Sequence, residues 1–565
     1  MLQSLLSFVV LLPRRLRVEV TLPLAAASVL VSAFFCLYGL GGFALRDNNE
    51  GLYASIARAM LADGDWLIPH LNGVPYIEKP PLLYWLEAVA MAAFGPTPSA
   101  ARLAAALPML ALCLGVNTFC RRHAGARAGW LAGAILSSMV PVALGAHLVL
   151  FDPLLCALLG GALLCWLHGV LASSSAAGRT AACLLALAVL DKGAVALVLA
   201  VGSAGLLVAL VRHARPGLRW RPPRGALLLF VALVLPWHVL AALRQPGFTW
   251  FYIVNEHVLR FLGRRLPDDY HHGPPWFYLG RVLLMVAPWT PFLALPVRGA
   301  NGATRGLLLR FCAAGVVFPL LFFSASQAKA DYYLIVCAPF LAVWLALVLD
   351  AALDEPSRAA GARLAWCWAA AVALCVVLLV ALPGADGRAW SPLLLALPLL
   401  GWLCLLAPCA RAWRALARAP APAREAAVLG IALLAAPLLA WAVGRAAAHE
   451  ADDSSRGIAA VLRELPGPAR TVFLYRDFED RFSTLPFYLG RNIPIIDSAS
   501  HDLAFGCAVA PQGRCIDHQA FLRRARAGPV AVAVHAARRD EFLAMAGPGW
   551  RSIAIGPRIV FLSVP

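Results

Sequence analysis

The sequence predicts a polytopic α-helical membrane protein with a small α/β domain at its carboxyl end. Its residues are 61% hydrophobic and its mean hydropathy is +0.75, which is beyond the range of an ordinary soluble domain. Apolar runs of about 18–22 residues recur along the chain, and a helix of this length crosses a bilayer. From about residue 447 these runs stop, and short strand-like and helix-like segments alternate instead.

The apolar runs predict about thirteen membrane spans. They lie at about residues 20–44, 101–120, 127–147, 153–172, 180–190, 194–211, 225–243, 276–297, 306–325, 333–350, 362–383, 391–408 and 425–443. A further run at 81–94 is short for a crossing, contains Glu87 and begins at a proline pair. We therefore expect an interfacial or re-entrant juxtamembrane helix there.

The positions of the arginines orient the spans. Arg14, Arg15 and Arg17 follow the first apolar run, which is the opposite order to a signal peptide and indicates a cytoplasmic anchor. Most other arginines flank apolar runs, so the net charge of +18 reports membrane topology and does not indicate a nucleic-acid partner. Alternation of the spans then places residues 45–100 and everything after 444 outside the cytoplasm.

Two domains are expected, a transmembrane domain at 1–446 and an α/β domain at 447–565. The second has about 120 residues, which is enough for a modest core of its own. Its cysteines Cys507 and Cys515 can form a disulfide if the domain is periplasmic. The chain has no GxGxxG loop after a strand and no Walker-type phosphate loop, so transport driven by ATP is unsupported.

Residues 45–80 are the first long polar stretch of the chain. From about Glu50 to Leu61 the apolar residues recur with helical periodicity, which predicts a short amphipathic helix in the plane of the membrane interface. The Pro69–Pro81 end is rigid and non-helical. We therefore expect a shaped polar cap on the membrane bundle, where a polar reaction on a lipid-borne substrate can occur.

Lysine is rare in this sequence. The chain holds 45 arginines but only three lysines, Lys79, Lys192 and Lys329. The predicted topology places all three at the extracytoplasmic ends of spans. Chance survival in a lysine-poor chain is one explanation. The other is that each lysine marks a site that needs a compact ammonium and not a guanidinium fork.

Ionisable residues gather in the predicted extracytoplasmic segments, where each is either a solvated loop charge or a functional-site candidate. Lysines, arginines and tyrosines suit an anionic phosphate. Carboxylates suit a base, or a partner for a hydroxyl or an amine. Together at a lipid-facing cap they predict transfer of a group from a lipid phosphate. Glu78 and His257 are also candidates to share a divalent metal ion, Zn or Mg.

Seven motifs between residues 45 and 340 carry a family resemblance. They are DNNEGLYASIARAML, DWLIPHLNGVPYIEKPPLLYWL, the short FDP, DKG, EHVLRF, GPPWFY and KADYYLIVCAPFLA. They resemble the bacterial lipid A aminoarabinose transferases, which belong to the GT-C superfamily of polyprenyl-phosphate-sugar-dependent glycosyltransferases, alongside the protein O-mannosyltransferases. The resemblance implies the GT-C fold, and the thirteen predicted spans and the carboxyl-terminal α/β domain match it.

The resemblance implies a multi-pass enzyme of the bacterial inner membrane with an active site that faces the periplasm. The donor would be an undecaprenyl-phosphate-linked sugar, 4-amino-4-deoxy-L-arabinose or similar, and the acceptor would be lipid A or another periplasmic molecule. The substrate-binding candidates are Asn49, Tyr53, Tyr76, Lys79, Arg260, Arg264, Lys329 and Tyr333. Carried over by motif, Lys79, Arg264 and Tyr333 would hold the donor phosphate, and Tyr53 and Tyr76 would line the pocket. Glu78 with His257 would match a metal pair, and Asp152 would match a functional acid.

The catalytic assignment departs from the family at one position. The family usually has Asp-Glu before the x-x-Tyr-Ala of the first loop, whereas this chain has Asn49-Glu50. Because asparagine cannot act as a base, two readings stay open. Either Asp47 replaces it, with Asp47, Glu50 and Asp152 as the catalytic candidates, or a lipid A phosphate attacks as an anion and needs no base.

Other functions compete with this one. The transferase could act on a protein hydroxyl or another glycan. A transporter or flippase for a lipid-linked sugar would show charges near mid-bilayer and repeated halves, and the sequence shows neither. A non-catalytic scaffold would leave the clustered extracytoplasmic charges unexplained.

Overall fold

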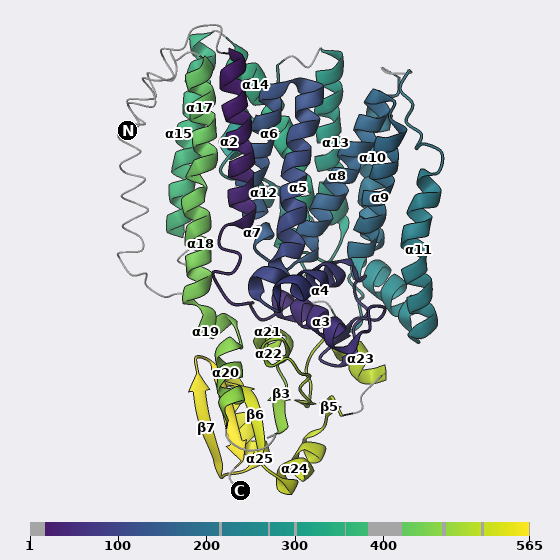
Figure 1. Ribbon diagram of the computed structural model, residues 1–565, viewed down its shortest axis with the longest axis vertical. Coiled ribbons are helices and arrows are strands. Elements are labelled where there is room, and N and C mark those ends of the chain that lie inside the picture. The colour runs from purple at the N-terminus through teal and green to yellow at the C-terminus, as the bar shows by residue number, and fades with distance from the viewer. Residues whose placement is uncertain are drawn as a thin grey trace.

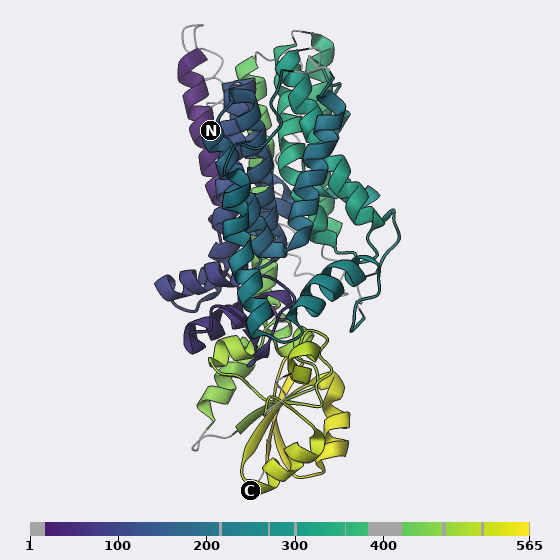
Figure 2. The ribbon, with the colours of Figure 1, turned by 90° about the vertical axis from the view of Figure 1, so that its right-hand side faces the viewer.

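The computed structural model describes residues 17–213, 217–268, 272–298, 302–355, 357–381, 421–465, 471–509 and 513–563. A bundle of long helices forms one end of the molecule and an α/β domain forms the other (Figure 1). Figure 2 shows that the α/β domain continues the long axis of the bundle. The predicted division between a helical membrane part and a strand-containing carboxyl-terminal part is visible in this arrangement.

The long helices of the bundle are continuous apolar segments. They are α2 (Arg17–Leu37), α5 (Pro98–Ala124), α6 (Ala126–Ser138), α7 (Val140–Ala146), α8 (Phe151–Ala172), α9 (Ser175–Lys192), α10 (Ala194–Val211), α11 (Ala226–Arg244), α13 (Ala303–Ala325), α14 (Ala338–Asp354), α15 (Arg358–Ala381), α17 (Ala421–Leu434) and α18 (Ala436–Ala448). Large apolar side chains such as Leu227 and Leu228 are about 70% exposed on α11, as expected for a surface that faces lipid.

Among the described residues, eight helical segments are long and apolar enough to cross a membrane, and the pair α6 and α7, bent by 67°, would make nine. The predicted span at 276–297 is broken into α12 (Phe277–Met285) and the short helix η3 (Thr290–Ala294). Pro288 and Pro291 lie at this break, where they remove backbone donors. The predicted span at 391–408 lies outside the described residues, so the total of thirteen stays a prediction.

The first loop forms a cap across one end of the bundle (Figure 1). It contains α3 (Asn49–Asp63), a hairpin of β1 (His70–Leu71) and β2 (Val74–Pro75), and α4 (Leu82–Phe94). The helix predicted near Glu50–Leu61 is present, and the 81–94 run is a short helix as expected.

The surroundings of α3 differ from the prediction. The helix packs between α4 and the short helices α21 (Glu479–Phe482) and α22 (Leu485–Leu489), and most of its residues are buried. A Cβ atom on Gly51 would lie 2.6 Å from the backbone nitrogen of Thr484, so the two chains approach too closely for any side chain. This helix therefore joins the two domains and does not lie in the lipid interface.

The carboxyl-terminal domain contains a six-stranded sheet in the order β5-β4-β3-β6-β8-β7. The strands are β3 (Thr471–Tyr475), β4 (Ile495–Ile496), β5 (Cys515–Ile516), β6 (Val530–His535), β7 (Trp550–Ile555) and β8 (Arg558–Ser563). Strands β5, β4, β3 and β6 are parallel, and β8 and β7 are antiparallel. Its helices are α19 (Glu450–Asp453), α20 (Arg456–Glu464), α21, α22, α23 (Ala504–Val509), α24 (His518–Ala527) and α25 (Arg539–Ala546). A disulfide joins Cys507 to Cys515, the pairing that the sequence made possible.

The parallel strands all direct their carboxyl ends toward the cap. The loops that follow β3 and β4 carry Glu479 and Asp502, and Arg558 at the start of β8 is paired with His535 at the end of β6. In open α/β sheets this edge is the usual place for ligand contacts. Here the membrane domain covers it.

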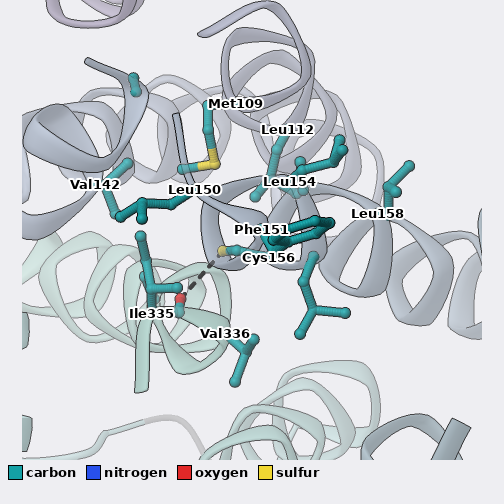
Figure 3. Packing of buried hydrophobic residues seen from close by; sticks show 14 of the residues in the cluster. Met109, Leu112, Val142, Leu150, Phe151, Leu154, Cys156, Leu158, Ile335 and Val336 are labelled. Atoms are coloured by element: carbon teal, nitrogen blue, oxygen red, sulfur yellow. Dashed lines mark hydrogen bonds between the residues drawn. The ribbon is translucent and has the colours of Figure 1, made fainter. Parts of the chain in front are cut away.

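The start of α8 is held by a well-packed apolar core. Figure 3 shows side chains at this start packed with residues of α5 and of η4 (Asp331–Cys337): Leu150, Phe151, Leu154, Met109, Leu112, Ile335 and Val336. The Cys156 thiol donates to the Ile335 carbonyl at 3.1 Å. This packing fixes the first turn of α8, which carries Asp152.

Candidate functional site

A cavity of about 560 Å³ lies between the cap, the bundle and the carboxyl-terminal domain. Its walls come from α3, the loop before α4, the first turns of α8 and α10, the helix η2 (Thr249–Leu259), the segment before η4, and the loop after β4. The lining is mixed, with several charged groups at the polar end and apolar side chains such as Val198, Val258 and Phe322 elsewhere. A cavity of this kind suits a ligand that has a charged head and an apolar tail.

Arg265 is the centre of the charged network. It is 5% exposed and donates through Nη2 to Glu78 Oε1 and through Nε to Glu256 Oε1, each at 2.6 Å. Lys79 Nζ lies 3.6 Å from Glu256 and 3.8 Å from Glu78, and Arg260 Nη1 lies 3.1 Å from Glu256. Three cations and two carboxylates therefore share one buried volume, with a surplus of positive charge.

Burial and neighbouring charges shift the pKa values of these groups in different directions. Burial raises the pKa of Glu78 to about 8, against the attraction of Arg265. Burial also opposes ionisation of Glu256, but Lys79, Arg260 and Arg265 together hold its pKa below the ordinary value. Burial and then Arg260 lower the pKa of Lys79. Such perturbed groups in a cavity are typical of a functional site.

A second ion pair also lines the cavity. Lys192, the last residue of α9, donates to Asp152 in the first turn of α8. The Lys192 ammonium also lies over the Tyr333 ring, 4.7 Å from its centroid. Asp152 is thus held by a cation, and Lys192 is held in position to face the cavity.

Tyrosines complete the polar end. The Tyr53 hydroxyl donates to Asn49 Oδ1 at 2.9 Å, and the Tyr76 hydroxyl donates to Glu78 Oε2 at 3.3 Å. Because Asn49 accepts through its oxygen, its amide N–H groups remain oriented for an acceptor. Asn49 is therefore placed to donate a hydrogen bond to a ligand, but an amide cannot act as a base.

Most of the predicted site residues converge on this cavity. Those that line it are Asn49, Tyr53, Tyr76, Glu78, Lys79, Asp152, His257, Arg260 and Tyr333. Four do not line it, namely Asp47, Glu50, Arg264 and Lys329, and each has a structural explanation.

Glu50 is a buried partner of Arg102. Its two oxygens accept from Arg102 Nε at 2.9 Å and Nη2 at 3.0 Å, and Oε1 also accepts from the Val149 N–H at 3.1 Å. Arg102 is fully buried and donates further to the Leu40 carbonyl at 2.7 Å. This bidentate pair ties the cap to the bundle. Glu50 is therefore held in a structural pair outside the cavity lining, and its catalytic role stays a prediction.

Asp47 joins the two domains. Its carboxylate accepts from Arg558 Nη2 at 2.5 Å, from the Thr484 hydroxyl at 2.6 Å and from the Ser455 hydroxyl at 3.0 Å. Both Asp47 and Arg558 have side chains that are 2% exposed. With its oxygens occupied in the domain interface, Asp47 is placed to hold the domains together and not to replace a base at Asn49.

We expect Asp47→Asn to loosen this interface. The change leaves Arg558 buried without a counter-charge, and breaking a buried pair in this way costs about 3–5 kcal/mol. Thermal unfolding of the detergent-solubilised protein should shift down, with faster proteolysis between the domains. The matched control is Asp453→Asn, which removes a more exposed pair with Arg46 and should cost no more than about 1 kcal/mol. Unchanged unfolding together with lost transfer would restore a catalytic role for Asp47.

Arg264 and Lys329 have other surroundings. Arg264 is exposed, and the next residue, Arg265, enters the cavity instead. The Lys329 ammonium donates to the carbonyls of Phe323 at 2.7 Å, Ser324 at 2.9 Å and Ser326 at 2.5 Å. It therefore satisfies the open carbonyls at the end of α13, as basic residues often do at helix ends.

The suggested metal pair does not fit the donor atoms present. The His257 Nδ1–H donates to the Tyr252 carbonyl at 2.6 Å, and Nε2 accepts from the Ala194 N–H at 3.1 Å, so neither nitrogen has a free lone pair. Glu78 is bound to Arg265. No cluster of three or more His, Cys, Asp or Glu residues suited to a metal ion occurs in the described part of the chain. We therefore derive no step through a metal.

Three charged residues of the cavity were not singled out from the sequence: Arg265, Glu256 and Asp502. Glu256 lies beside the predicted residue His257 in the EHVLRF motif, so this motif was a signal that could have identified it. Arg265 was missed because the family resemblance pointed to its neighbour, Arg264. Asp502 comes from the other domain and carried no local signal.

Comparison with known proteins supports the resemblance. The family model for dolichyl-phosphate-mannose-protein mannosyltransferases matches residues 78–240. A protein from Shewanella sediminis is 29% identical over 345 residues, covering 59% of this chain and 61% of the relative. A protein from Pseudomonas aeruginosa is 32% identical over 342 residues, covering 59% and 60%. Both are named undecaprenyl phosphate-α-4-amino-4-deoxy-L-arabinose arabinosyl transferase, and the chain spans about three fifths of their length.

A solved structure matches over nearly the whole chain. The crystal structure of ArnT from Cupriavidus metallidurans bound to undecaprenyl phosphate aligns with a TM-score of 0.78 and 24% identity, covering 95% of this chain and 97% of that one. This likeness confirms the predicted fold class of a GT-C-type helical membrane protein.

The most extensive of these sequence matches is with a protein from Sodalis glossinidius that carries the same arabinosyl transferase name. It is 31% identical over 406 residues, covering 67% of this chain and 70% of the relative. With that identity and coverage, and with the common fold, this chain belongs to the family of undecaprenyl phosphate-α-4-amino-4-deoxy-L-arabinose arabinosyl transferases.

Proposed function

We propose that this protein is a membrane glycosyltransferase that moves 4-amino-4-deoxy-L-arabinose, or a close analogue, from undecaprenyl phosphate to a phosphate of lipid A. The observation that carries the proposal is the cavity that Lys79, Arg260 and Lys192 line together with apolar side chains such as Val198 and Phe322. The names of the relatives supply the sugar and the carrier lipid. A multi-pass bundle provides access for substrates that stay in the membrane.

In the proposed reaction the bond between the sugar's anomeric carbon and the donor phosphate oxygen breaks. An oxygen of the acceptor phosphate forms the new bond to that carbon, and undecaprenyl phosphate leaves with one additional negative charge. Lys79 and Arg260 stabilise this developing charge, since a preorganised cation acts most strongly where charge appears. An acceptor phosphate is already an anion, so Asn49 in place of an acid removes nothing that the reaction needs. Asp152 positions Lys192 through their ion pair.

The proposal places the cavity on the periplasmic side of the inner membrane. Two observations support this side. Arginines cluster at the predicted cytoplasmic ends of the spans. The disulfide between Cys507 and Cys515 belongs to a domain beside the cavity, and such bonds persist in oxidising compartments.

A transferase that acts on a protein hydroxyl is the second candidate. The match of residues 78–240 to the mannosyltransferase family model favours it. A hydroxyl acceptor needs a base, however, and Asp152, the only one of the predicted catalytic acids among the described cavity-lining residues, is paired with Lys192. The lipid phosphate acceptor therefore agrees better with this cavity.

Reconstituted transfer is the test. The purified protein in vesicles, supplied with undecaprenyl-phosphate-linked aminoarabinose and lipid A, should yield lipid A whose mass increases by one sugar. Replacement of the donor by the corresponding nucleotide sugar, with no lipid carrier, should yield none. Transfer from the nucleotide sugar would refute the proposed donor. A product formed on added protein but not on lipid A would favour the second candidate.

A further inference from the structure

The carboxyl-terminal domain places one of its own residues in the cavity. The loop after β4 contains Asp502, which lines the cavity beside the cap. Glu479 holds this loop, because its Oε1 accepts from the Ser500 hydroxyl at 2.5 Å and from the Asp502 backbone N–H. Glu479 is itself buried at the start of α21. The position of Asp502 is therefore determined by the covered edge of the sheet and not by a free loop.

Asp502 differs from the other acids of the cavity in its partners. Four carboxylates line the cavity, and three of them are in ion pairs: Glu78 and Glu256 with Arg265, and Asp152 with Lys192. Among the described residues, no hydrogen bond or ion pair engages the Asp502 carboxylate. Of the acids that line the cavity, Asp502 is thus the one whose carboxylate has no partner among the described residues.

An ionised carboxylate without a partner is unfavourable in a cavity that excludes water, unless a ligand supplies the opposite charge. Burial and then Glu479 raise the pKa of Asp502 to about 7, against the attraction of Arg265, Lys79 and Arg260. A ligand cation that contacts the carboxylate would remove this cost, because a buried charge is stable when it is paired and hydrogen-bonded. The cations on the protein are already directed toward Glu78 and Glu256.

The proposed donor carries such a cation. In 4-amino-4-deoxy-L-arabinose the amine at C4 is protonated near neutral pH. C1, which bears the phosphate, and C4 lie across the six-membered ring from each other. We infer that Asp502 is a specificity-determining residue that binds the protonated C4 amine of the donor sugar while Lys79 and Arg260 hold its phosphate. This inference rests on the proposed function and extends it to the recognition of the sugar.

The test compares two donors. One is undecaprenyl-phosphate-linked aminoarabinose and the other is its analogue with a hydroxyl at C4. Asp502→Asn keeps the shape of the side chain and removes its charge. We expect kcat/KM for the amino donor to fall about 10- to 100-fold, in line with the loss of a hydrogen bond to a charged group. For the hydroxyl donor it should stay within a few-fold, so the preference of the wild type for the amine is lost.

Matched variants complete the experiment. Asp540→Asn makes the same change at an exposed position in the same domain and should leave both donors unaffected. Asp502→Ser provides the same comparison should the asparagine variant fold poorly. An unchanged donor preference, or an equal loss with both donors, would overturn the inference while the proposed function stands. A wild-type protein that uses neither donor would overturn both.

Discussion

Lys79→Ala is expected to lower the transfer rate about 10²- to 10³-fold while the protein still folds and inserts. This is the usual cost of removing one preorganised donor that faces the charge developing in the transition state. Lys79 lies between Glu78 and a proline pair, so its backbone is restrained. Its ammonium lies 3.6 Å from Glu256 and lines the cavity. Transfer assays normalised to inserted protein measure the effect.

The conservative change separates charge from fit. Lys79→Arg should restore activity only in part, because a planar guanidinium does not occupy the place of a compact ammonium. The alternative is that Lys79 merely extends toward lipid headgroups. Its 16% side-chain exposure and its contacts with two buried carboxylates argue against this. Activity within a few-fold of wild type in both variants would show that the alternative is right.

Arg265→Met is expected to destabilise the protein by about 3–5 kcal/mol and to abolish transfer. The change leaves Glu78 and Glu256 buried without their shared partner, and an uncompensated buried charge has a cost of this size. Methionine keeps much of the side-chain volume, so the loss reports charge more than packing. Thermal unfolding in detergent and the transfer assay measure the two effects.

Its neighbour provides the control. Arg264→Met removes an exposed charge that does not line the cavity, so transfer should stay within a few-fold of wild type. A second arm is the double variant Arg265→Met with Glu78→Gln. It should recover part of the stability that Arg265→Met loses, because one of the two carboxylates that lost Arg265 no longer carries a charge. If Arg264→Met were the damaging change, the family-based assignment would be right and the cavity would need a different arrangement.

The sequence alone determined the features that depend on local pattern. Hydropathy predicted a helical membrane bundle, because an apolar run must bury its backbone polar groups in helices to cross a bilayer. The cap was predicted by its polar composition, and its central helix by a repeat of apolar residues. Lys79 and Glu78 were found because the IEKPP motif is rigid and because lysine is rare. Each of these signals lies within a few tens of residues.

Tertiary structure decided which charged groups meet. Asp47 and Arg558 are separated by 511 residues, and nothing in the pattern of the first loop shows that this acid is already paired. Glu50 likewise contacts Arg102 on α5 and the Val149 N–H in the segment before α8. Both acids are paired with residues that are distant in the chain, which the sequence did not indicate, and their catalytic roles stay predictions.

The same reason explains Arg264, Arg265 and Asp502. Consecutive residues in an irregular segment point in different directions, and outside a helix or strand there is no period from which to tell which one faces inward. Asp502 belongs to a separate domain, whose sheet packs with its carboxyl edge against the cap. Only this packing brings Asp502 into the cavity. Local periodicity encodes elements, whereas the composition of a buried site depends on contacts between elements that are distant in the chain.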